Sequence, residues 1–343
     1  MIARVRRGGE VESRHRGDAA VVGEDGRLLA ECGDPSLKVF LRSAAKPFQA
    51  LPLLEAGGVE RFHLTASDVA LICASHGGEP RHVRGARRLL RIGGFRASDL
   101  ICGPHLPVHE SSARALLVSG KRPSRLHNNC SGKHAGLLLA CRLLGFPPKG
   151  YWQPSHPLQL LIRRRLSELA SFPEKDIDWA VDGCGLVVFR LPLRALALAY
   201  ARLLGVRVSG ETKREARARA TVARAMWDRP DMVAGTGFFT TAFLRAGRGR
   251  WIGKEGAEGV YAVGLRASAT AKRAAGIALK IEDGSARARP AMTLALMREM
   301  GWLPRSRRRS LAEFESPAVE NTAGAVVGSI DAEVPIIRRD AAG

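Results

Sequence analysis

The sequence has no feature of a membrane-spanning, secreted or disulfide-stabilised protein. No apolar run reaches the roughly 20 residues that a helix needs to cross a bilayer, and the basic segment 1–13 is not followed by the apolar stretch of a secretory signal. Six cysteines in 343 residues are too few for a disulfide scaffold. We therefore expect a soluble, cytoplasmic protein with no membrane partner, whose cysteines are core residues, metal ligands or reactive thiols.

Acidic and aromatic residues are also scarce. Asp and Glu number 33 against 54 Lys and Arg, a formal net charge of +21, and aromatic residues make up 6%. This charge raises the question of nucleic-acid binding. The arginines are spread through expected helices apart from one cluster at 305–309, and no aromatic residues interleave with them to stack on bases. With no zinc-finger, helix-turn-helix or RNA-binding signature either, we expect no specific nucleic-acid partner.

Hydrophobic residues make up 45% of the chain, enough to bury a sizeable core. Asp25 and Gly26 separate two apolar segments and predict a hairpin turn. The patterns predict helices at 82–90, 111–118, 135–145, 155–170, 193–204, 211–227 and 285–300, strands at 69–74, 178–181, 259–265 and 276–282, and a turn at 252–256. Strict alternation is absent, so a mixed sheet covered by helices is favoured over a doubly wound parallel sheet. We expect a single domain, 1–343, with a basic, weakly patterned tail at 303–343.

The segment RSAAKP at 42–47 is the first candidate for chemistry. Ser43 and Lys46 are three residues apart and lie on one side of a helical turn. A serine hydroxyl needs an adjacent base to become a nucleophile, and a lysine serves when its amine is neutral. Pro47 is tolerated only in a first turn, which places Ser43 at a helix start, where free N–H groups can hold an oxyanion. Because this spacing is common, a solvated serine and lysine is the alternative interpretation.

Four polar, glycine-flanked loops accompany this segment: ASHGGE, HNNCSGKH, DGCG and GKEG. In the second loop, Cys130 lies three residues before Lys133 and four before His134, so all three can face one point. Cys184 lies in the third loop. Thiolates from two loops can bind zinc at about 2.3 Å. A structural zinc site normally takes four ligands, so buried thiols without metal remain the alternative.

Seven blocks together resemble the type II-like, rhizobial-type L-asparaginase family: LRSAAKPFQALPLLEAG, CASHGGEP, HNNCSGKHAG, SHPLQ, DGCG, MVAGTG and GKEGAEGVYAVGL. They occur in order from about residue 10 to residue 290. The family is similar in fold to the serine β-lactamases and glutaminases. The resemblance implies an α/β (α+β) fold with a mixed, largely antiparallel sheet flanked by helices. It also implies a homodimer that hydrolyses L-asparagine to L-aspartate and ammonia.

The resemblance further implies roles for individual residues. Ser43 matches the nucleophile and Lys46 its base, whereas Ser75 and Lys254 match a second serine–lysine pair at the same pocket. The matching zinc ligands are Cys130, Lys133 and Cys184, with water completing the shell.

Three residues are candidates for holding the substrate's α-groups. Asp182 precedes the cysteine ligand Cys184 and matches a position close to metal and substrate, so it is our candidate partner for the α-ammonium group. Arg42 or His134 is the candidate for the α-carboxylate. Surface salt bridges or helix-start polar residues are the alternative interpretations.

Two departures from the family pattern concern specificity. Residues 186–189 read LVVF where many members carry a proline, and the chain after Pro290 is poorly matched. Alternatives are a glutaminase or β-lactam-type serine hydrolase and, outside enzymes, a basic nucleic-acid-associated protein. The Ser-Asp-Asn and Lys-Thr-Gly motifs of β-lactamases are absent. The sequence leaves the preference between asparagine and glutamine open.

Overall fold

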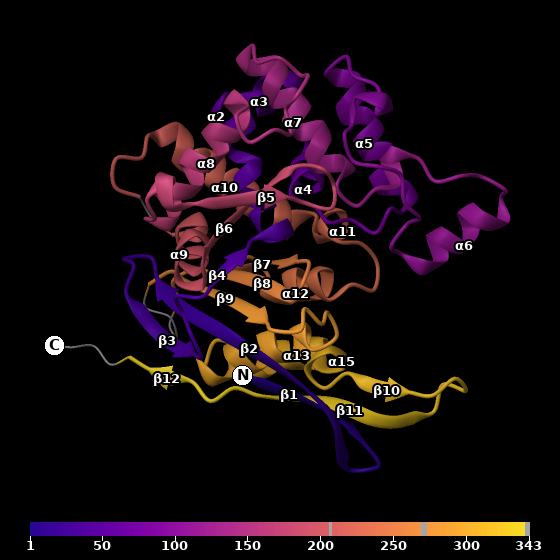
Figure 1. The fold of residues 1–343 in the computed structure, drawn as a ribbon, viewed down its shortest axis with the longest axis vertical. Coiled ribbons are helices and arrows are strands. Elements are labelled where there is room, and N and C mark those ends of the chain that lie inside the picture. Colours follow the sequence, from indigo (N-terminus) through magenta and orange to yellow (C-terminus); the bar gives the residue numbers. More distant parts are fainter. Residues whose placement is uncertain (206–207, 269–272, 340–343) are drawn as a thin grey trace. The chain divides into compact units, whose positions relative to one another are not determined.

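The computed structural model describes residues 1–205, 208–268 and 273–339 and shows the predicted α+β fold with a largely antiparallel sheet (Figure 1). The chain divides into two compact units. The first, here called the sheet unit, comprises Met1–Ala44, Leu191–Val206 and Ala246–Gly343. The second, the helical unit, comprises Ala45–Arg190 and Arg207–Arg245. Within the described ranges, no helix combines the length and the apolar character that a membrane span requires.

A curled antiparallel sheet forms the centre of the sheet unit. Its strands run in the order β10-β11-β1-β2-β9-β8-β7, and β3 pairs with β2 and with β12. Their bounds are β1 (Ile2–Arg7), β2 (Glu10–Gly23), β3 (Leu28–Cys32), β7 (Trp251–Gly256), β8 (Val260–Leu265), β9 (Ala275–Ile281), β10 (Ala318–Glu320), β11 (Val326–Glu333) and β12 (Ile337–Arg338). The turn between β2 and β3 contains Asp25 and Gly26, as predicted, and is closed by the Gly23 N–H donating to Arg27 O at 2.9 Å.

Helices α9 (Leu193–Leu204) and α13 (Arg289–Glu299) cover this sheet. Every residue of β8 is buried, so both faces of that strand are covered. Helix α9 approaches closely because β8 and β9 present glycines to it: a Cβ on Gly264 would lie 2.5 Å from Tyr200 O, and one on Gly276 would lie 1.8 Å from Ala197 O. These two glycines therefore set the distance between helix and sheet.

Two segments of the sheet unit have a secondary structure that the sequence pattern did not predict. The turn predicted at 252–256 is wrong, because these residues form strand β7, which pairs with β8, and the chain turns at 257–259 instead. The basic segment after Trp302 contains α14 (Arg305–Arg308), η5 (Arg309–Leu311), α15 (Ala312–Glu315) and strands β10 to β12, of which β11 pairs with β1. A single domain with a separate tail stays a prediction.

Helix α4 (Ala66–Ile72) lies at the centre of the helical unit, packed by α5 (Pro80–Ile92), α7 (Ser131–Leu144), α10 (Lys213–Asp228) and α11 (Pro230–Val233). The strand predicted at 69–74 is therefore wrong. Thr65 and Asp68 form a capping box that begins a helix here. A short apolar run suits a buried strand and a buried helix equally, so its pattern does not distinguish the two.

The helical unit begins with α1 (Lys46–Gln49) and α2 (Leu51–Glu55), with Pro47 in the first turn of α1 as predicted. The two helices meet at Ala50, since Pro52 has no N–H to extend the ladder. The remaining elements of both units are β4 (Lys38–Phe40), η1 (Arg42–Ala45), α3 (Gly58–Phe62), η2 (Ala97–Asp99), α6 (Glu110–Val118), η3 (Arg125–His127), α8 (Pro157–Ala170), η4 (Glu174–Asp176), β5 (Asp178–Val181), β6 (Val187–Pro192) and α12 (Phe239–Gly247).

Candidate active site

In the helical unit, a buried lysine contacts a serine from a distant part of the chain. Lys46, at the start of α1, is 2% exposed, and its Nζ donates to Ala74 O at 2.6 Å and to Ser75 Oγ at 3.0 Å. Ser75 is half-buried and begins the loop after α4. A serine–lysine contact of this kind is what proton transfer between hydroxyl and amine requires.

The loop that carries Ser75 is held on both sides by backbone hydrogen bonds. They run from Ser75 N to Val233 O (3.0 Å), from His76 N to Asn129 O (3.2 Å) and from Gly77 N to Ala234 O (2.7 Å). Three of the sequence blocks, CASHGGEP, HNNCSGKHAG and MVAGTG, therefore lie side by side. The polar loops that looked unconnected in the sequence form one framework around Ser75.

His76 stabilises this framework from within. Its ring is 1% exposed and stacks on His82 with 4.9 Å between centroids. Nδ1 accepts from the Gly78 N–H at 3.1 Å, which assigns the ring proton to Nε2, 2.9 Å from Ser131 Oγ. Burial, reinforced by the positive charges of His82 and Lys46, lowers the pKa of His76 well below its usual value. The imidazole is therefore neutral and serves as a fixed link between two loops.

Cys130, Lys133 and Cys184 form a second buried group in the same unit. Cys130 directly precedes α7, Lys133 lies in its first turn, and Cys184 lies in the turn between β5 and β6. Lys133 Nζ donates to Cys184 Sγ at 3.0 Å. A hydrogen bond with Cys184, together with the charges of Lys46 and Lys133, lowers the pKa of Cys130 despite its burial. The pKa of Lys133 is raised, because attraction to both sulfurs outweighs its burial.

The donor set of this group fits zinc. Two sulfurs and one amine converge, and thiolates with a nitrogen donor are ligands that zinc prefers. Binding would require the Lys133 ammonium to lose its proton so that its lone pair is free. Among the described residues there is no cluster of three or more His, Cys, Asp or Glu side chains suited to a metal. Lysine participation is thus essential to the predicted site.

Two further predicted residues lie close to this group. His134 is fully buried on α7, with Nδ1 2.9 Å from the Tyr151 hydroxyl, and its Nε2 has no hydrogen-bond partner in the described part of the chain. Burial and the charges of Lys133 and Lys46 lower the pKa of His134, so it is neutral. Asp182 is half-buried, accepts from the Gly183 N–H at 2.7 Å, and contributes to the raised pKa of Lys133.

Arg42, Ser43 and Lys254 lie in the sheet unit. Arg42 has a φ of +48°, a left-handed conformation that is uncommon for a residue with a side chain and costs about 1–3 kcal/mol. Strain of this kind immediately before Ser43 is typical of functional sites. The next residue, Ala44, is anchored through its carbonyl, which accepts from the Tyr200 hydroxyl at 2.7 Å.

Lys254 lies on the side of β7 that faces this strained segment. A Cβ on Gly256 would lie 2.8 Å from Leu41 O, and residues two apart on a strand point to the same face. Lys254 is fully buried and donates to Glu255 Oε1 at 2.7 Å and to Glu255 O at 3.2 Å. The sheet unit therefore brings Lys254 to the face along which the Ser43 segment runs.

Sequence reasoning missed the residues that support these loops. Glu79 is buried at the start of α5 and accepts from Thr236 N at 2.9 Å and from Thr236 Oγ1 at 3.0 Å, as well as from Arg81. Although burial favours the protonated form, the hydrogen bonds from Arg81 and Thr236 outweigh it and lower the pKa of Glu79. Glu79 lies in the block CASHGGEP and Thr236 in the block MVAGTG. Their place in these two blocks is the signal that could have pointed to them.

Comparisons with known proteins place the chain in a family. Two solved structures are similar to it at 15% identity and a TM-score of 0.37: one described as "Crystal Structure Analysis of Mglu" and one as "Crystal structure of Mglu in its native form in the presence of 4.3M NaCl". The matches cover 84% and 83% of this chain, and 67% and 61% of those chains. A search of the curated proteins found no match. The family model for L-asparaginase II matches residues 3–332, nearly the whole chain. This protein therefore belongs to the L-asparaginase II family and is an asparaginase-type amidohydrolase.

Proposed function

We propose that this protein hydrolyses L-asparagine to L-aspartate and ammonia through a serine acyl-enzyme. The observation that carries the proposal is the hydrogen bond from the buried Lys46 to Ser75 in a chain of this family. Lys46 lies three residues beyond Ser43. Lys46 has no acidic partner among the described residues, and its contact with a serine suits proton transfer better than a surface salt bridge would. A fold similar to the serine β-lactamases and glutaminases is part of the same proposal.

Ser43 is the proposed nucleophile and Lys46 its base. A neutral amine has two N–H bonds, enough for the contacts with Ala74 O and Ser75 Oγ, and its lone pair remains for the Ser43 proton. The Ser43 oxygen then bonds to the side-chain amide carbon. Backbone N–H groups at the start of the helix stabilise the oxyanion, worth on the order of 3 kcal/mol per donor. The carbon–nitrogen bond breaks as the leaving nitrogen of the substrate takes the proton from Lys46, and ammonia leaves with Lys46 neutral again.

Water completes the reaction. It attacks the acyl ester, and the proton it loses returns by way of Lys46 to Ser43 as L-aspartate is released. Ser75 and Lys254 act as the second serine–lysine pair, which relays protons or positions the amide. The 3.0 Å contact with Lys46 also makes Ser75 the competing candidate for nucleophile, because Lys46 already contacts its hydroxyl.

Cys130, Lys133 and Cys184 are the proposed zinc ligands. When bound, zinc would supply a positive charge that orients the substrate and crosslinks α7 to the hairpin of β5 and β6. The serine hydroxyl remains the nucleophile in this scheme. Asp182 is the proposed partner of the substrate α-ammonium, and Arg42 or His134 that of the α-carboxylate. Nε2 of His134 has no hydrogen-bond partner among the described residues, and with the Tyr151 hydroxyl donating to Nδ1 it carries the ring proton and suits a carboxylate oxygen.

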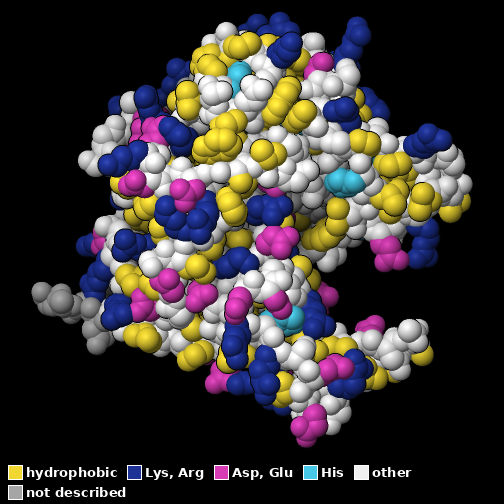
Figure 2. Space-filling model, in the orientation of Figure 1, with side chains coloured by type: hydrophobic (Ala, Val, Ile, Leu, Met, Phe, Trp, Pro, Cys, Tyr) yellow, Lys and Arg dark blue, Asp and Glu magenta, His cyan; other side chains and the backbone are white. Residues whose placement is uncertain are grey.

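A cytoplasmic homodimer without a nucleic-acid partner completes the proposal. On the visible face, Lys and Arg are interspersed with acidic and apolar side chains (Figure 2), which supports a solvated basic surface over a continuous track for nucleic acid. Light scattering on the purified chain tests the dimer. Retention on DNA near physiological salt would contradict the absence of a nucleic-acid partner.

Trapping the acyl-enzyme tests the function and its nucleophile together. Wild type, Ser43→Ala and Ser75→Ala are mixed with L-asparagine, ammonia release is measured, and acid-quenched samples are digested for peptide mass analysis. We expect ammonia from the wild type, an aspartyl adduct on the peptide that contains Ser43, and neither with Ser43→Ala. An adduct on the peptide that contains Ser75 would reassign the nucleophile. Release from L-glutamine alone would replace asparaginase by glutaminase, and release from neither amide would refute the proposal.

A further inference from the structure

A cavity of about 810 Å³ lies in the helical unit beside the loop that carries Ser75. One face of α5 and one face of α6 line it together with residues of the loop after α6, and it is open to solvent. Its floor is rigid, because a Cβ on Gly78 would lie 2.9 Å from Pro107 Cα and 3.0 Å from His127 O. The volume is within the range of small-molecule sites.

The charge of this cavity is entirely positive. Its lining includes Arg84 and Arg87 from α5 and Lys121 and Arg122 from the loop after α6, and it contains no Asp or Glu. Within the described ranges, none of these four side chains has an ion-pair or hydrogen-bond partner. The charge of Arg87 also helps to lower the pKa of His127 at the floor, behind the larger effect of burial, so Arg87 acts on the cavity interior. Four unpaired cations around one space repel each other, and a bound anion would relieve that repulsion.

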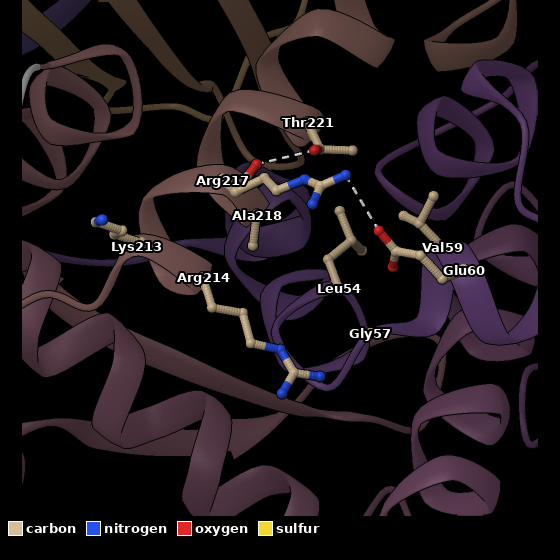
Figure 3. Close-up of a pocket in the computed structure, with 9 residues that line it drawn as sticks. All are labelled: Leu54, Gly57, Val59, Glu60, Lys213, Arg214, Arg217, Ala218 and Thr221. Carbon is tan, nitrogen blue, oxygen red and sulfur yellow. Dashed lines mark hydrogen bonds and ion pairs between the residues drawn. The ribbon is translucent and has the colours of Figure 1, made fainter.

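In a second basic cavity, a basic side chain forms an ion pair with an acidic one. The cavity measures about 490 Å³ and lies between the segment 54–60 and α10. Figure 3 shows the Arg217 guanidinium directed at Glu60, 3.2 Å away, so part of the positive charge there is already neutralised. The side chain of Arg214 lies against Gly57, 2.8 Å from where a Cβ would be. Acidic compensation is present in this second cavity and absent from the first.

The other lining residues match the chemistry of a phosphate ester. Ser111 contributes a hydroxyl group that has no side-chain hydrogen bond among the described residues, whereas Ser119 Oγ donates to Leu116 O at 2.8 Å and Ser124 Oγ lies 3.0 Å from His127 Nδ1. Arginine with hydroxyl donors is the usual combination for phosphate oxygens. Val83 and Leu116 add an apolar wall. We propose that this cavity, separate from the asparaginase site, binds a small molecule that carries two or more phosphates. Four cations exceed what a single carboxylate needs, and a volume of about 810 Å³ suits a small molecule.

Calorimetric titration near physiological salt tests the proposal, with pyrophosphate and ATP as probes. The test variant is Arg84→Gln with Arg87→Gln. The matched control is Arg91→Gln with Arg164→Gln, which removes two equally exposed helical arginines that do not line the cavity. We expect saturable binding of about one pyrophosphate per chain, weakened at least about tenfold in the test variant and less than about twofold in the control. Tighter binding of ATP would show that the apolar wall also contributes.

Three results would overturn the proposal. They are the absence of saturable binding of either probe, equal weakening in the test and control variants, and binding of single-stranded DNA in preference to both probes. The last two would mean that net charge attracts polyanions without a built site. Melting temperatures of both variants within a few degrees of the wild type show that the substitutions leave the fold intact. Because the readout is binding, failure here leaves the proposed asparaginase activity unaffected.

Discussion

Removing the Ser75 hydroxyl tests the contact on which the proposed chemistry depends. Lys46 is 2% exposed, so little of its side chain is open to water that could replace a lost partner. In Ser75→Ala, only Ala74 O remains of its two hydrogen-bond partners in the helical unit. The amine would then be less firmly held in the orientation needed for proton transfer.

The size of the effect follows from the type of hydrogen bond lost. A hydrogen bond to a charged group contributes about 1.5–3 kcal/mol. If that amount is lost in the transition state, kcat falls about 10- to 150-fold, since each 1.36 kcal/mol is tenfold. KM should change little, because the lost contact acts on the base and leaves the substrate's α-groups untouched.

The assay is ammonia release from L-asparagine, with kcat and KM measured separately. Ser131→Ala is the matched control: it removes a buried hydroxyl that contacts His76 and Leu126 O in the adjoining loop but does not touch Lys46. We expect this control to lower the melting temperature more than kcat. If Ser75→Ala keeps kcat within about twofold of the wild type, the contact with Lys46 has no catalytic role. Equal losses of kcat in both variants would indicate a purely structural effect.

Three further predictions concern stability and the metal. Burial raises the pKa of Glu55 to about 7 despite its ion pair with Arg165. Because this exceeds the ordinary glutamate pKa of about 4.5, its stabilising contribution is full below about pH 4.5 and is lost as the pH rises through about 7, by up to about 3 kcal/mol. Denaturant unfolding from pH 4.5 to 8 should show that loss of unfolding free energy in the wild type and not in Glu55→Gln. The control is Glu168→Gln, which replaces a 44% exposed side chain and should keep the pH dependence of the wild type. The same pH dependence in the wild type and Glu55→Gln would contradict the prediction. Gly235→Ala should reduce the unfolding free energy by about 2 kcal/mol or more, since φ is +124° and the new Cβ would lie 2.3 Å from Glu79 Oε1. Gly237→Ala, with φ +78° and open space around it, should cost only about 1–2 kcal/mol, so equal losses would exclude the clash as the cause. Chelation should remove about one zinc per chain, lower the melting temperature and raise KM more than it lowers kcat; complete loss of turnover with intact folding would refute the orienting role given to the metal.

Local signals predicted most of the longer helices. Pro157 begins α8, and the helix predicted at 193–204 matches α9 in both bounds. Such predictions succeed because caps, turns and periodicity involve residues close in sequence. The strand predicted at 69–74 and the turn predicted at 252–256 are wrong for one shared reason. Both segments are short and buried, so their state depends on packing partners that periodicity does not reveal.

The sequence blocks named the candidate catalytic and zinc-binding residues, because rare residues at set spacing mark a family before any contact is known. They did not point to the supporting contacts of Glu79 with Thr236 and Arg81. Those blocks were enough for the reaction class, the candidate nucleophiles and the proposed zinc ligands. They could not show that Lys46 meets Ser75, 29 residues away, or that Lys133 meets Cys184, 51 residues away. They also could not reveal four unpaired cations around one cavity. Contacts of this range arise only when helices such as α1, α4 and α7 pack, and packing depends on the whole chain at once.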